Sequence, residues 1–302
     1  MLSFFANIFG YVLKLLYNIV GNYGWAIVLF SILVKVVMIP LSIKQQKTMK
    51  KNEKIQGELK QIQFKYKNEP EKLNQEMMDL YKREGMSPFS GCLSSIIQII
   101  LLFSVFLLVR QPLTYMVKMD QEAISKMEQI VTENDSNSKN AYQEIEVIQY
   151  ARSIQNGGSV EEQNQDIKDY IEQASLNMDF FGIDLTQVPT KNPKDIKVLI
   201  IPILYVISSF ISIRLSMAST NKKNKEDKKL ITDGTEEQEE KYNPSEDVNK
   251  TMGWMMPIMS VTIAIIAPLG LALYWLMNNI LMIVERLVIN KYLNKEEAKD
   301  NA

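Results

Sequence analysis

Apolar residues are gathered in a few long blocks along the chain, and most charged residues lie between them. The blocks occupy residues 24–43, 92–109, 197–217 and 252–290. A helix needs about 20 apolar residues to cross a bilayer, so each of the first three blocks predicts one membrane span. The last block is too long for one helix, and Pro268 and Gly270 place a turn inside it. The pattern therefore predicts five spans, with the last two joined as a tight hairpin.

The distribution of lysine and arginine beside these spans predicts their orientation. Residues 44–84 carry 11 Lys and Arg against 7 Asp and Glu, whereas residues 111–195 carry 7 against 15. Loops rich in Lys and Arg stay in the cytoplasm. We therefore expect the first segment inside and the second outside, with the N-terminus outside and the C-terminus in the cytoplasm.

The whole pattern predicts an all-α integral membrane protein built around a five-transmembrane-helix bundle. The predicted segments are an interfacial helix at 1–22, spans at 23–43, 91–110, 196–218, 251–268 and 269–290, a cytoplasmic helical hairpin at 44–90, an acidic extracytoplasmic loop at 111–195, a cytoplasmic linker at 219–250 and a short cytoplasmic tail at 291–302. The linker carries a cluster of glutamates and few apolar residues, so we expect it to be disordered.

The first 20 residues are apolar, but two asparagines and a lysine interrupt them. No basic region precedes the apolar stretch, as it would in a secretory signal. Leu13, Leu16, Tyr17 and Val20 share one helical face. This favours an amphipathic helix that lies on the outer membrane surface, with a sixth span or an uncleaved signal as the alternatives.

The cytoplasmic segment has two helical patterns separated by Pro70. Its apolar seam consists of Ile55, Leu59, Ile62, Tyr66, Leu73, Met77 and Leu80. Because proline interrupts a helix, the two patterns predict an antiparallel helical hairpin with charged outer faces. The hairpin is either a solvated spacer or a mobile surface that meets cytoplasmic partners. We favour the second, because a few residues suffice to join two spans.

Lys35 lies in the middle of the first predicted span and is the strongest functional signal in the chain. A lone cation at the centre of a spanning helix costs about 2.5–3.5 kcal/mol on insertion scales, so it is not expected without a use. The ammonium group is expected to hold water inside the membrane, and Lys35→Leu is expected to insert normally. Alternatively, Lys35 snorkels toward the cytoplasm, since Ile43 lies about 12 Å further along the helix.

The composition argues against catalysis. The chain has no histidine and one cysteine, which removes the commonest general base, the commonest metal ligand and an internal disulfide. It also lacks Walker, Rossmann and G-x-S-x-G motifs. We therefore expect neither an enzyme nor a protein that carries a metal or another cofactor.

Three segments resemble the membrane protein insertases of the YidC/Oxa type. They are NYGWAIVLFSILVKVVMIPLSIKQQKTM with the hairpin behind it, GCLSSIIQIILLFSVFLLVRQPL, and APLGLALYWLMNNILMIVERLVINKYL. The resemblance implies a hydrophilic groove, open to the cytoplasm and to lipid, that receives a hydrophobic segment and passes it into the bilayer. It implies a bacterial cell membrane location. The implied partners are nascent membrane proteins, the lipid bilayer, the ribosome and the Sec translocon, without sequence-specific nucleic acid binding.

Within this resemblance, Lys35 stands where the family commonly has an intramembrane arginine, five residues before Pro40, which Leu41 follows. The remaining candidates for the groove and client binding are Ser31, Gln98, Ser208, Ser212, Trp275 and Asn279, with Ser209, Tyr274 and Asn278 beside them. Such polar residues also serve as interhelical contacts in membrane bundles, which is the alternative interpretation. Trp275 has a further alternative interpretation, as an aromatic residue at the membrane interface.

Some features depart from the family pattern. The predicted outer loop is longer than in compact members, and the nearly charge-balanced tail is unlike the basic tails that hold ribosomes. The chain shows no large folded extracytoplasmic domain, which suggests the short form of single-membrane bacteria.

A small-solute or ion transporter that uses Lys35 is the alternative function, and a membrane-embedded enzyme is a weaker one. A transporter should have acidic coupling partners and internal repeats. The predicted spans offer only Glu285, near the cytoplasmic end, and no internal symmetry is visible.

Overall fold

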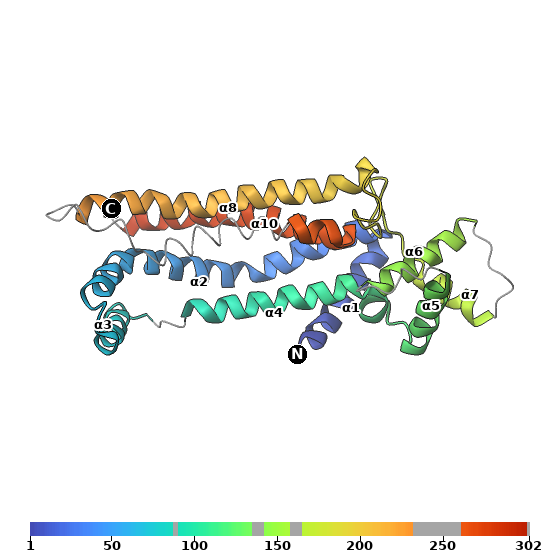
Figure 1. The fold of residues 1–302 in the computed structure, drawn as a ribbon, viewed down its shortest axis with the longest axis horizontal. Coiled ribbons are helices and arrows are strands. Elements are labelled where there is room, and N and C mark those ends of the chain that lie inside the picture. The colour runs from blue at the N-terminus through green and yellow to red at the C-terminus, as the bar shows by residue number, and fades with distance from the viewer. Residues whose placement is uncertain (87–89, 135–141, 158–164, 232–260, 301–302) are drawn as a thin grey trace. The chain divides into compact units, whose positions relative to one another are not determined.

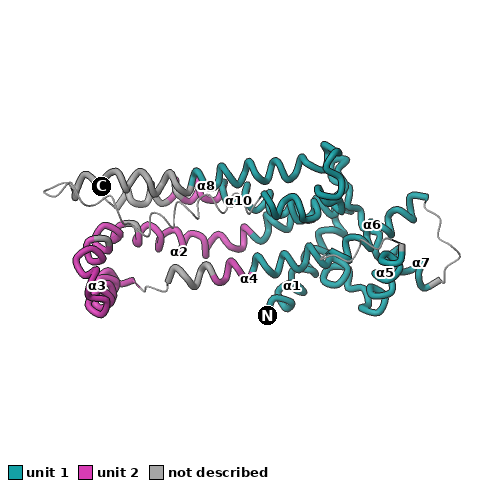
Figure 2. The backbone as a smooth tube through the Cα atoms, viewed as in Figure 1, with its two compact units in different colours: residues 1–34, 101–215, 242–283 teal, residues 35–100, 216–241, 284–302 magenta. Residues whose placement is uncertain are grey.

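The computed structural model describes residues 1–86, 90–134, 142–157, 165–231 and 261–300. Within these residues the secondary structure is helical apart from one two-stranded ribbon (Figure 1). The chain divides into two compact units (Figure 2). Unit 1 comprises residues 1–34, 101–215 and 242–283, and unit 2 comprises residues 35–100, 216–241 and 284–302.

Long helices carry the apolar blocks of the sequence. They are α1 (Leu2–Val20), α2 (Tyr23–Lys65), α4 (Ser90–Arg110), α8 (Ile196–Ile231) and α10 (Leu269–Asp300). Four of the described helices, α1, α2, α8 and α10, are long and apolar enough to cross a membrane, judged by length and composition alone. In α4 the corresponding apolar stretch, Ile96–Arg110, is shorter.

These helices match the predicted spans only in part. The predicted spans at 23–43, 196–218 and 269–290 fall on three of the four candidate helices, and 91–110 falls on α4. Residues 251–260 of the remaining predicted span lie outside the described residues, and residues 261–266 are helical. The helical membrane protein is therefore supported, while the arrangement of five spans stays a prediction.

Helix α1 packs through the face that the sequence pattern singled out. Leu13 is 1% exposed, and the ring of Phe9 meets that of Phe30 edge to face, with 5.7 Å between centroids. A Cβ at Gly10 would overlap the backbone carbonyl of Tyr115, so the glycine lets α1 approach the neighbouring turn closely. The interfacial position of α1 stays a prediction, because the helix is also long enough to span.

The connector (residues 111–195) is a folded layer rather than an open loop. It contains the π-helical turn η1 (Leu113–Val117), α5 (Gln121–Asn134), α6 (Gln143–Gln155), α7 (Gln165–Ala174), β1 (Asp179–Phe180) and β2 (Ile183–Asp184). Its buried side chains include Ile124, Met127, Ile148 and Met178, each at most 1% exposed. An acidic surface therefore encloses an apolar core.

The connector also holds the first turn of α10. The backbone N–H of Leu269 donates to the Gln187 carbonyl, and that of Gly270 donates to the Leu185 carbonyl, both at 2.9 Å. The first N–H groups of a helix have no partner inside the helix, so such carbonyls complete its N-terminus. The turn predicted at Pro268 is thus present, and the connector fixes where α10 begins.

Unit 2 contains the two helical arms expected for the hairpin, whose cytoplasmic location stays a prediction. Helix α2 continues through Pro40 to Lys65, and α3 (Pro70–Arg83) returns beside it. Ile55 and Leu80 are buried, and the other five seam residues are partly buried. Tyr66 Oη donates to Glu76 Oε1 at 3.3 Å, which joins the two arms.

The helices that carry two of the predicted spans run beyond them. Helix α8 continues beyond the predicted span to Ile231, so residues 219–231 of the predicted disordered linker are helical, whereas residues 232–250 lie outside the described residues. Helix α10 likewise continues through the predicted tail to Asp300. Both extensions are rich in lysine, which favours helix, and neither contains glycine or proline.

Candidate functional site

Lys35 forms an ion pair inside unit 2. Its Nζ lies 2.6 Å from Oε2 of Glu285, and the two side chains are 16% and 10% exposed. The other carboxylate oxygen, Glu285 Oε1, is buried and accepts no hydrogen bond from the described residues. A charged pair with unused hydrogen-bonding capacity therefore joins α2 to α10.

This pair corrects the expectation that Lys35 is a lone cation. Removing one member of a buried ion pair leaves the other charge uncompensated, which costs about 3–5 kcal/mol. Lys35→Leu would leave Glu285 in that state, so the substitution is no longer expected to be harmless to the fold. The pairing was not foreseen because Glu285 was considered only as a group near the end of its predicted span.

Position along the two helices could have revealed the partner. Lys35 lies 12 residues after the start of α2 at Tyr23, and Glu285 lies 16 residues after the start of α10 at Leu269. At 1.5 Å per residue these are rises of about 18 and 24 Å. The similar depths, together with the tendency of intramembrane charges to pair, point to this contact.

A second polar cluster lies in unit 1, between α8 and α10. Asn279 Nδ2 donates to Ser209 Oγ at 2.7 Å and approaches Ser208 Oγ at 3.4 Å. Ser208 Oγ donates to the carbonyl of Tyr205 at 2.8 Å, and the Tyr205 ring lies 5.8 Å from that of Trp275. The structure thus brings together three residues predicted for the site: Ser208, Trp275 and Asn279.

Other predicted residues are placed differently. Ser31 is 4% exposed, and its Oγ donates to the carbonyl of Ile27 in its own helix, at 2.8 Å. Gln98 is exposed on α4 in unit 2 and makes no side-chain hydrogen bond with the described residues. Ser212 and Tyr274 are both 7% exposed, and Asn278 is partly buried. The groove role of these residues stays a prediction.

Sequence reasoning missed the roles of Glu285 and Tyr205. Glu285 was considered only as a possible coupling group, and Tyr205 carried no signal beyond its place in an apolar helix. Ser209 was noted as a hydroxyl beside the candidates, and it makes the shorter contact with Asn279. The sequence could not choose between Ser208 and Ser209, because it does not give the rotation of α8 that decides which hydroxyl faces Asn279.

The described part of the chain offers no metal site. No group of three or more Cys, Asp or Glu side chains within it is arranged to hold an ion. The polar groups of the Lys35–Glu285 pair and of the Asn279 cluster are an ammonium, a carboxylate, hydroxyls and an amide. They can hydrogen-bond to water or to polar groups of another chain.

Comparison with known proteins identifies the family. The family model described as 60Kd inner membrane protein matches residues 15–297. The membrane protein insertase YidC of Treponema denticola is 28% identical over 285 residues, which cover 94% of this chain and 37% of that protein.

The proteins of the same name from Helicobacter pylori and Francisella tularensis are 42% and 41% identical over 106 residues, covering 35% of this chain and 19% of each relative. The chain therefore spans well under half the length of these relatives. Because the family model nonetheless matches almost the whole chain, the chain belongs to the 60Kd inner membrane protein family.

Proposed function

We propose that this chain is a membrane protein insertase that receives hydrophobic segments of nascent proteins and releases them laterally into the bilayer. Family membership supports this proposal, and so does the name of the relatives, membrane protein insertase YidC. The observation that carries the proposal is the Lys35–Glu285 pair, because it holds two charges within the apolar stretches of α2 and α10. No catalytic step is needed, since transfer into lipid is favoured by burial of the client's apolar surface.

The chemistry of the pair suggests how it acts. An ammonium group has three N–H donors, and Glu285 takes one of them. The free donors, together with the unpaired Oε1 of Glu285, favour water or a polar group of a client. A client segment with polar or charged residues would exchange hydrogen bonds here instead of losing them in hydrocarbon. The Asn279 cluster would offer hydroxyl and amide partners in the same way.

Topology and partners are part of the proposal. Residues 111–195 would lie outside, whereas residues 44–90, 219–250 and the C-terminus would face the cytoplasm, where the ribosome delivers clients. The Sec translocon would be a membrane partner. Single cysteines at the exposed positions Glu172 and Gln63, in a Cys92→Ser background, test the orientation with an impermeant thiol reagent in intact cells. Labelling of position 63 but not of position 172 from outside the cell would show the opposite orientation.

The function is tested with matched changes of the ion pair. Lys35→Leu alone is expected to lower stability, because Glu285 is left unpaired. The double variant Lys35→Leu/Glu285→Leu removes both charges and should recover a stable membrane protein. If the pair serves clients, that stable variant will fail with clients that carry charged tails and will handle nearly uncharged tails better. Lys35→Arg keeps a cation and should retain activity.

The outcome against the proposal is equally clear. A double leucine variant that inserts both classes of client as well as the parent would show that the pair has no part in insertion. Site-specific crosslinking from positions 208 and 279 to a stalled nascent membrane protein gives an independent measurement. Absence of crosslinks to any client, with the protein intact in the membrane, would argue against the insertase itself.

The ion pair is also a specific observation in favour of the alternative function, a transporter. A transporter should place an acidic residue beside its intramembrane lysine, and Glu285 does so. Uptake of a solute or protons by proteoliposomes that contain only this protein would support a transporter. Loss of that uptake in the double leucine variant would assign it to the pair. We favour the insertase because of the family.

A further inference from the structure

The ribbon in the connector presents an exposed phenyl ring at its tip. Strands β1 and β2 pair Asp179 with Asp184 and Phe180 with Ile183, which leaves Phe181 and Gly182 as a two-residue turn. Both turn residues have positive φ, 53° and 74°, as tight hairpins often require. Such a conformation suits glycine but is rare for a bulky residue. Nevertheless Phe181 occupies it, with 77% of its surface exposed.

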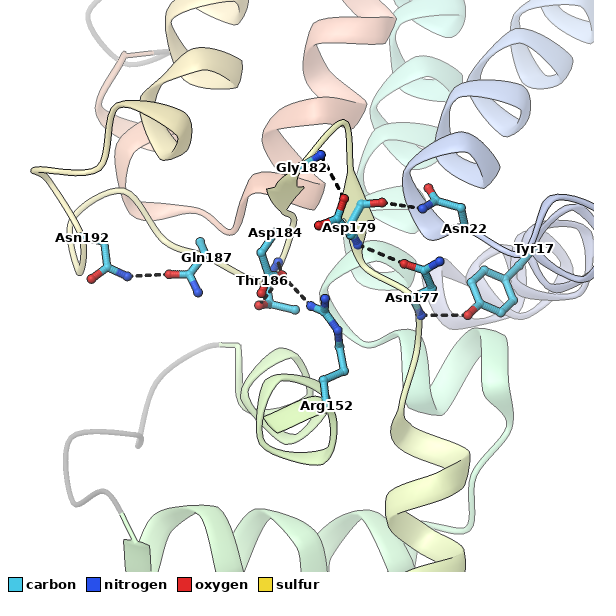
Figure 3. A network of polar contacts seen from close by, with 10 residues as sticks. All are labelled: Tyr17, Asn22, Arg152, Asn177, Asp179, Gly182, Asp184, Thr186, Gln187 and Asn192. Atoms are coloured by element: carbon cyan, nitrogen blue, oxygen red, sulfur yellow. Dashed lines mark hydrogen bonds and ion pairs between the residues drawn. The ribbon is translucent and has the colours of Figure 1, made fainter. Parts of the chain in front are cut away.

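Several contacts fix the ribbon beside the N-terminal end of α2. The Asn22 side chain donates to the Asp179 carbonyl, and the Asp179 carboxylate accepts the Gly182 N–H at 2.9 Å (Figure 3). A Cβ at Gly24 would overlap the ring of Phe180, so that ring lies directly on the helix backbone. The direction of Phe181 is therefore set by a fixed scaffold.

Phe180, Phe181 and Trp25 form an aromatic cluster. Trp25 lies 5.4 Å from Phe180 and 5.6 Å from Phe181, and the two phenylalanines are 4.8 Å apart, all with rings inclined edge to face. Trp25 is 45% exposed. The cluster is thus packed within itself but open on its outer side, and none of the described residues of unit 1 covers the exposed face of Phe181.

The cluster is continuous with an apolar stripe of α2. Leu29, Ile32 and Leu33 follow Trp25 at helical spacing and are 37–42% exposed. Because α2 is long and apolar enough to span a membrane, this stripe has lipid as its natural neighbour. The aromatic cluster extends the stripe past the first residue of the helix, where a span meets the headgroup region.

Basic side chains lie beside the ribbon tip. Lys194 and Lys197 line the same surface hollow as Gly182, and both are exposed. The acidic residues of this hollow are engaged, since Asp184 pairs with Arg152 and Asp195 accepts the Lys197 backbone N–H. Aromatic rings with lysines beside them suit the bilayer interface, where rings enter the headgroup layer and ammonium groups meet phosphates.

We propose that Phe181, supported by Phe180 and Trp25, is an interfacial anchor that seats the ribbon in the headgroup layer of the bilayer at the N-terminal end of α2. The partner is the lipid itself. The anchor would hold the connector, and with it the first turn of α10, at a constant depth. This assignment depends on α2 being a span and is independent of whether the protein inserts clients.

The test uses the full chain in liposomes of phosphatidylcholine and phosphatidylglycerol, with a Cys92→Ser background. Phe181→Cys carries an environment-sensitive NBD fluorophore, and Glu172→Cys on the exposed side of α7 is the matched control. At position 181 we expect blue-shifted emission and stronger quenching by lipids with a doxyl group at acyl carbon 5 than at carbon 12. Aqueous iodide should quench position 172 but hardly affect position 181.

Two results would overturn the anchor. Quenching of position 181 by iodide to the same extent as position 172 would place the ribbon tip in water. Shielding from iodide without quenching by doxyl lipids would mean that a protein surface, such as a second copy of the chain, covers the tip.

A pair of substitutions separates lipid contact from backbone strain. Asparagine adopts positive φ more readily than phenylalanine, so relief of strain alone predicts slower amide hydrogen exchange of residues 179–186 in Phe181→Asn. Loss of an anchor predicts the opposite, faster exchange in bilayers, with slow exchange kept in Phe181→Trp. Exchange in Phe181→Asn that is equal to or slower than that of the parent would contradict the proposal.

Discussion

The hairpin of unit 2 and the connector of unit 1 are both built from amphipathic helical segments, yet they bury their apolar faces to different extents. In the hairpin, two of the seven seam residues are buried, at 6% and 3% exposed. In the connector, Ile124, Met127 and Ile148 are at most 1% exposed. Two helices can cover only one side of each other, whereas the connector surrounds its core with three helices, η1 and α1.

The difference teaches that amphipathic periodicity predicts a buried face but not how completely it is buried. The polar contacts follow the same division. In the hairpin, Arg83 and Glu58 pair with side chains that are 60% and 53% exposed. In the connector, Glu144 is 3% exposed and accepts N–H bonds from Leu113 and Thr114 at 2.7 and 3.0 Å. The connector should therefore behave as a rigid part of the fold and the hairpin as a peripheral one.

The largest effect is expected from a cavity in the connector. Ile148→Ala should lower the free energy of unfolding by about 2–5 kcal/mol, because the side chain is fully buried. Its counterpart in the hairpin, Ile62→Ala, removes a partly buried side chain and gains helix propensity, so its cost should be well below that. Thermal unfolding in detergent compares the two. Equal losses would remove the distinction between the regions.

A smaller effect is expected from the carboxylate that begins η1. Glu144→Ala leaves buried N–H groups of Leu113 and Thr114 without an acceptor, which should cost about 1–3 kcal/mol. Glu144→Gln keeps an acceptor oxygen and should cost less. Detergent unfolding of both variants measures the difference, and an alanine variant as stable as the parent would contradict the assigned cap.

The same residue predicts a pH dependence. Burial raises the pKa of the Glu144 carboxyl, and hydrogen bonds from Thr114 and Leu113 offset this only in part. Because the folded state then binds the proton more tightly than the unfolded state, the contribution of Glu144 to stability falls as pH rises from the usual carboxyl range through the raised pKa. Nearby Glu128 also has a raised pKa because of burial. Unfolding temperatures of the parent and of Glu144→Gln are measured across pH 4–8. Their difference at each pH isolates how the contribution of Glu144 to stability changes with pH.

Breaking the exposed ion pair of the hairpin should have little effect. The Arg83–Glu58 contact raises the pKa of the Arg83 guanidinium, but both side chains are largely in water, where salt screens them. Arg83→Ala, Glu58→Ala and the double variant should unfold within experimental error of the parent at physiological salt. A clear coupling between the two substitutions would mean that the hairpin is more rigid than its burial indicates.

The smallest effect on stability is expected from removing the hairpin altogether. Replacing residues 52–82 with a short Gly/Ser linker should leave a stable membrane protein, because the seam is formed between the two arms themselves. Insertion activity should nevertheless fall if the hairpin engages clients or targeting factors. Membrane-fraction yield and client insertion are measured together. Loss of the protein from the membrane would show that the hairpin supports the fold.

Much of the fold could be predicted from local pattern. The positions of the long apolar helices, the turn at Pro268 and the seam of the hairpin all follow from periodicity and helix-breaking residues, which act over a few neighbours. Lys35 was recognised because a charge in an apolar run is costly wherever the helix lies. The helical continuation of α8 was not predicted because the charged linker was interpreted as disordered, although lysine also favours helix.

Tertiary structure alone decided the partners. Lys35 and Glu285 are about 250 residues apart in sequence, and they pair because their two helices reach similar depths. A rule based on neighbouring residues cannot predict such a contact. The contact of Asn279 with Ser209, the core of the connector and the aromatic cluster around Phe181 are likewise contacts between distant segments. The sequence by itself determined which helices form and where polar groups interrupt them, because those depend on short-range sterics and hydrophobicity. Which polar group meets which was decided by packing, because hydrogen bonds and ion pairs form only where the fold brings their atoms together.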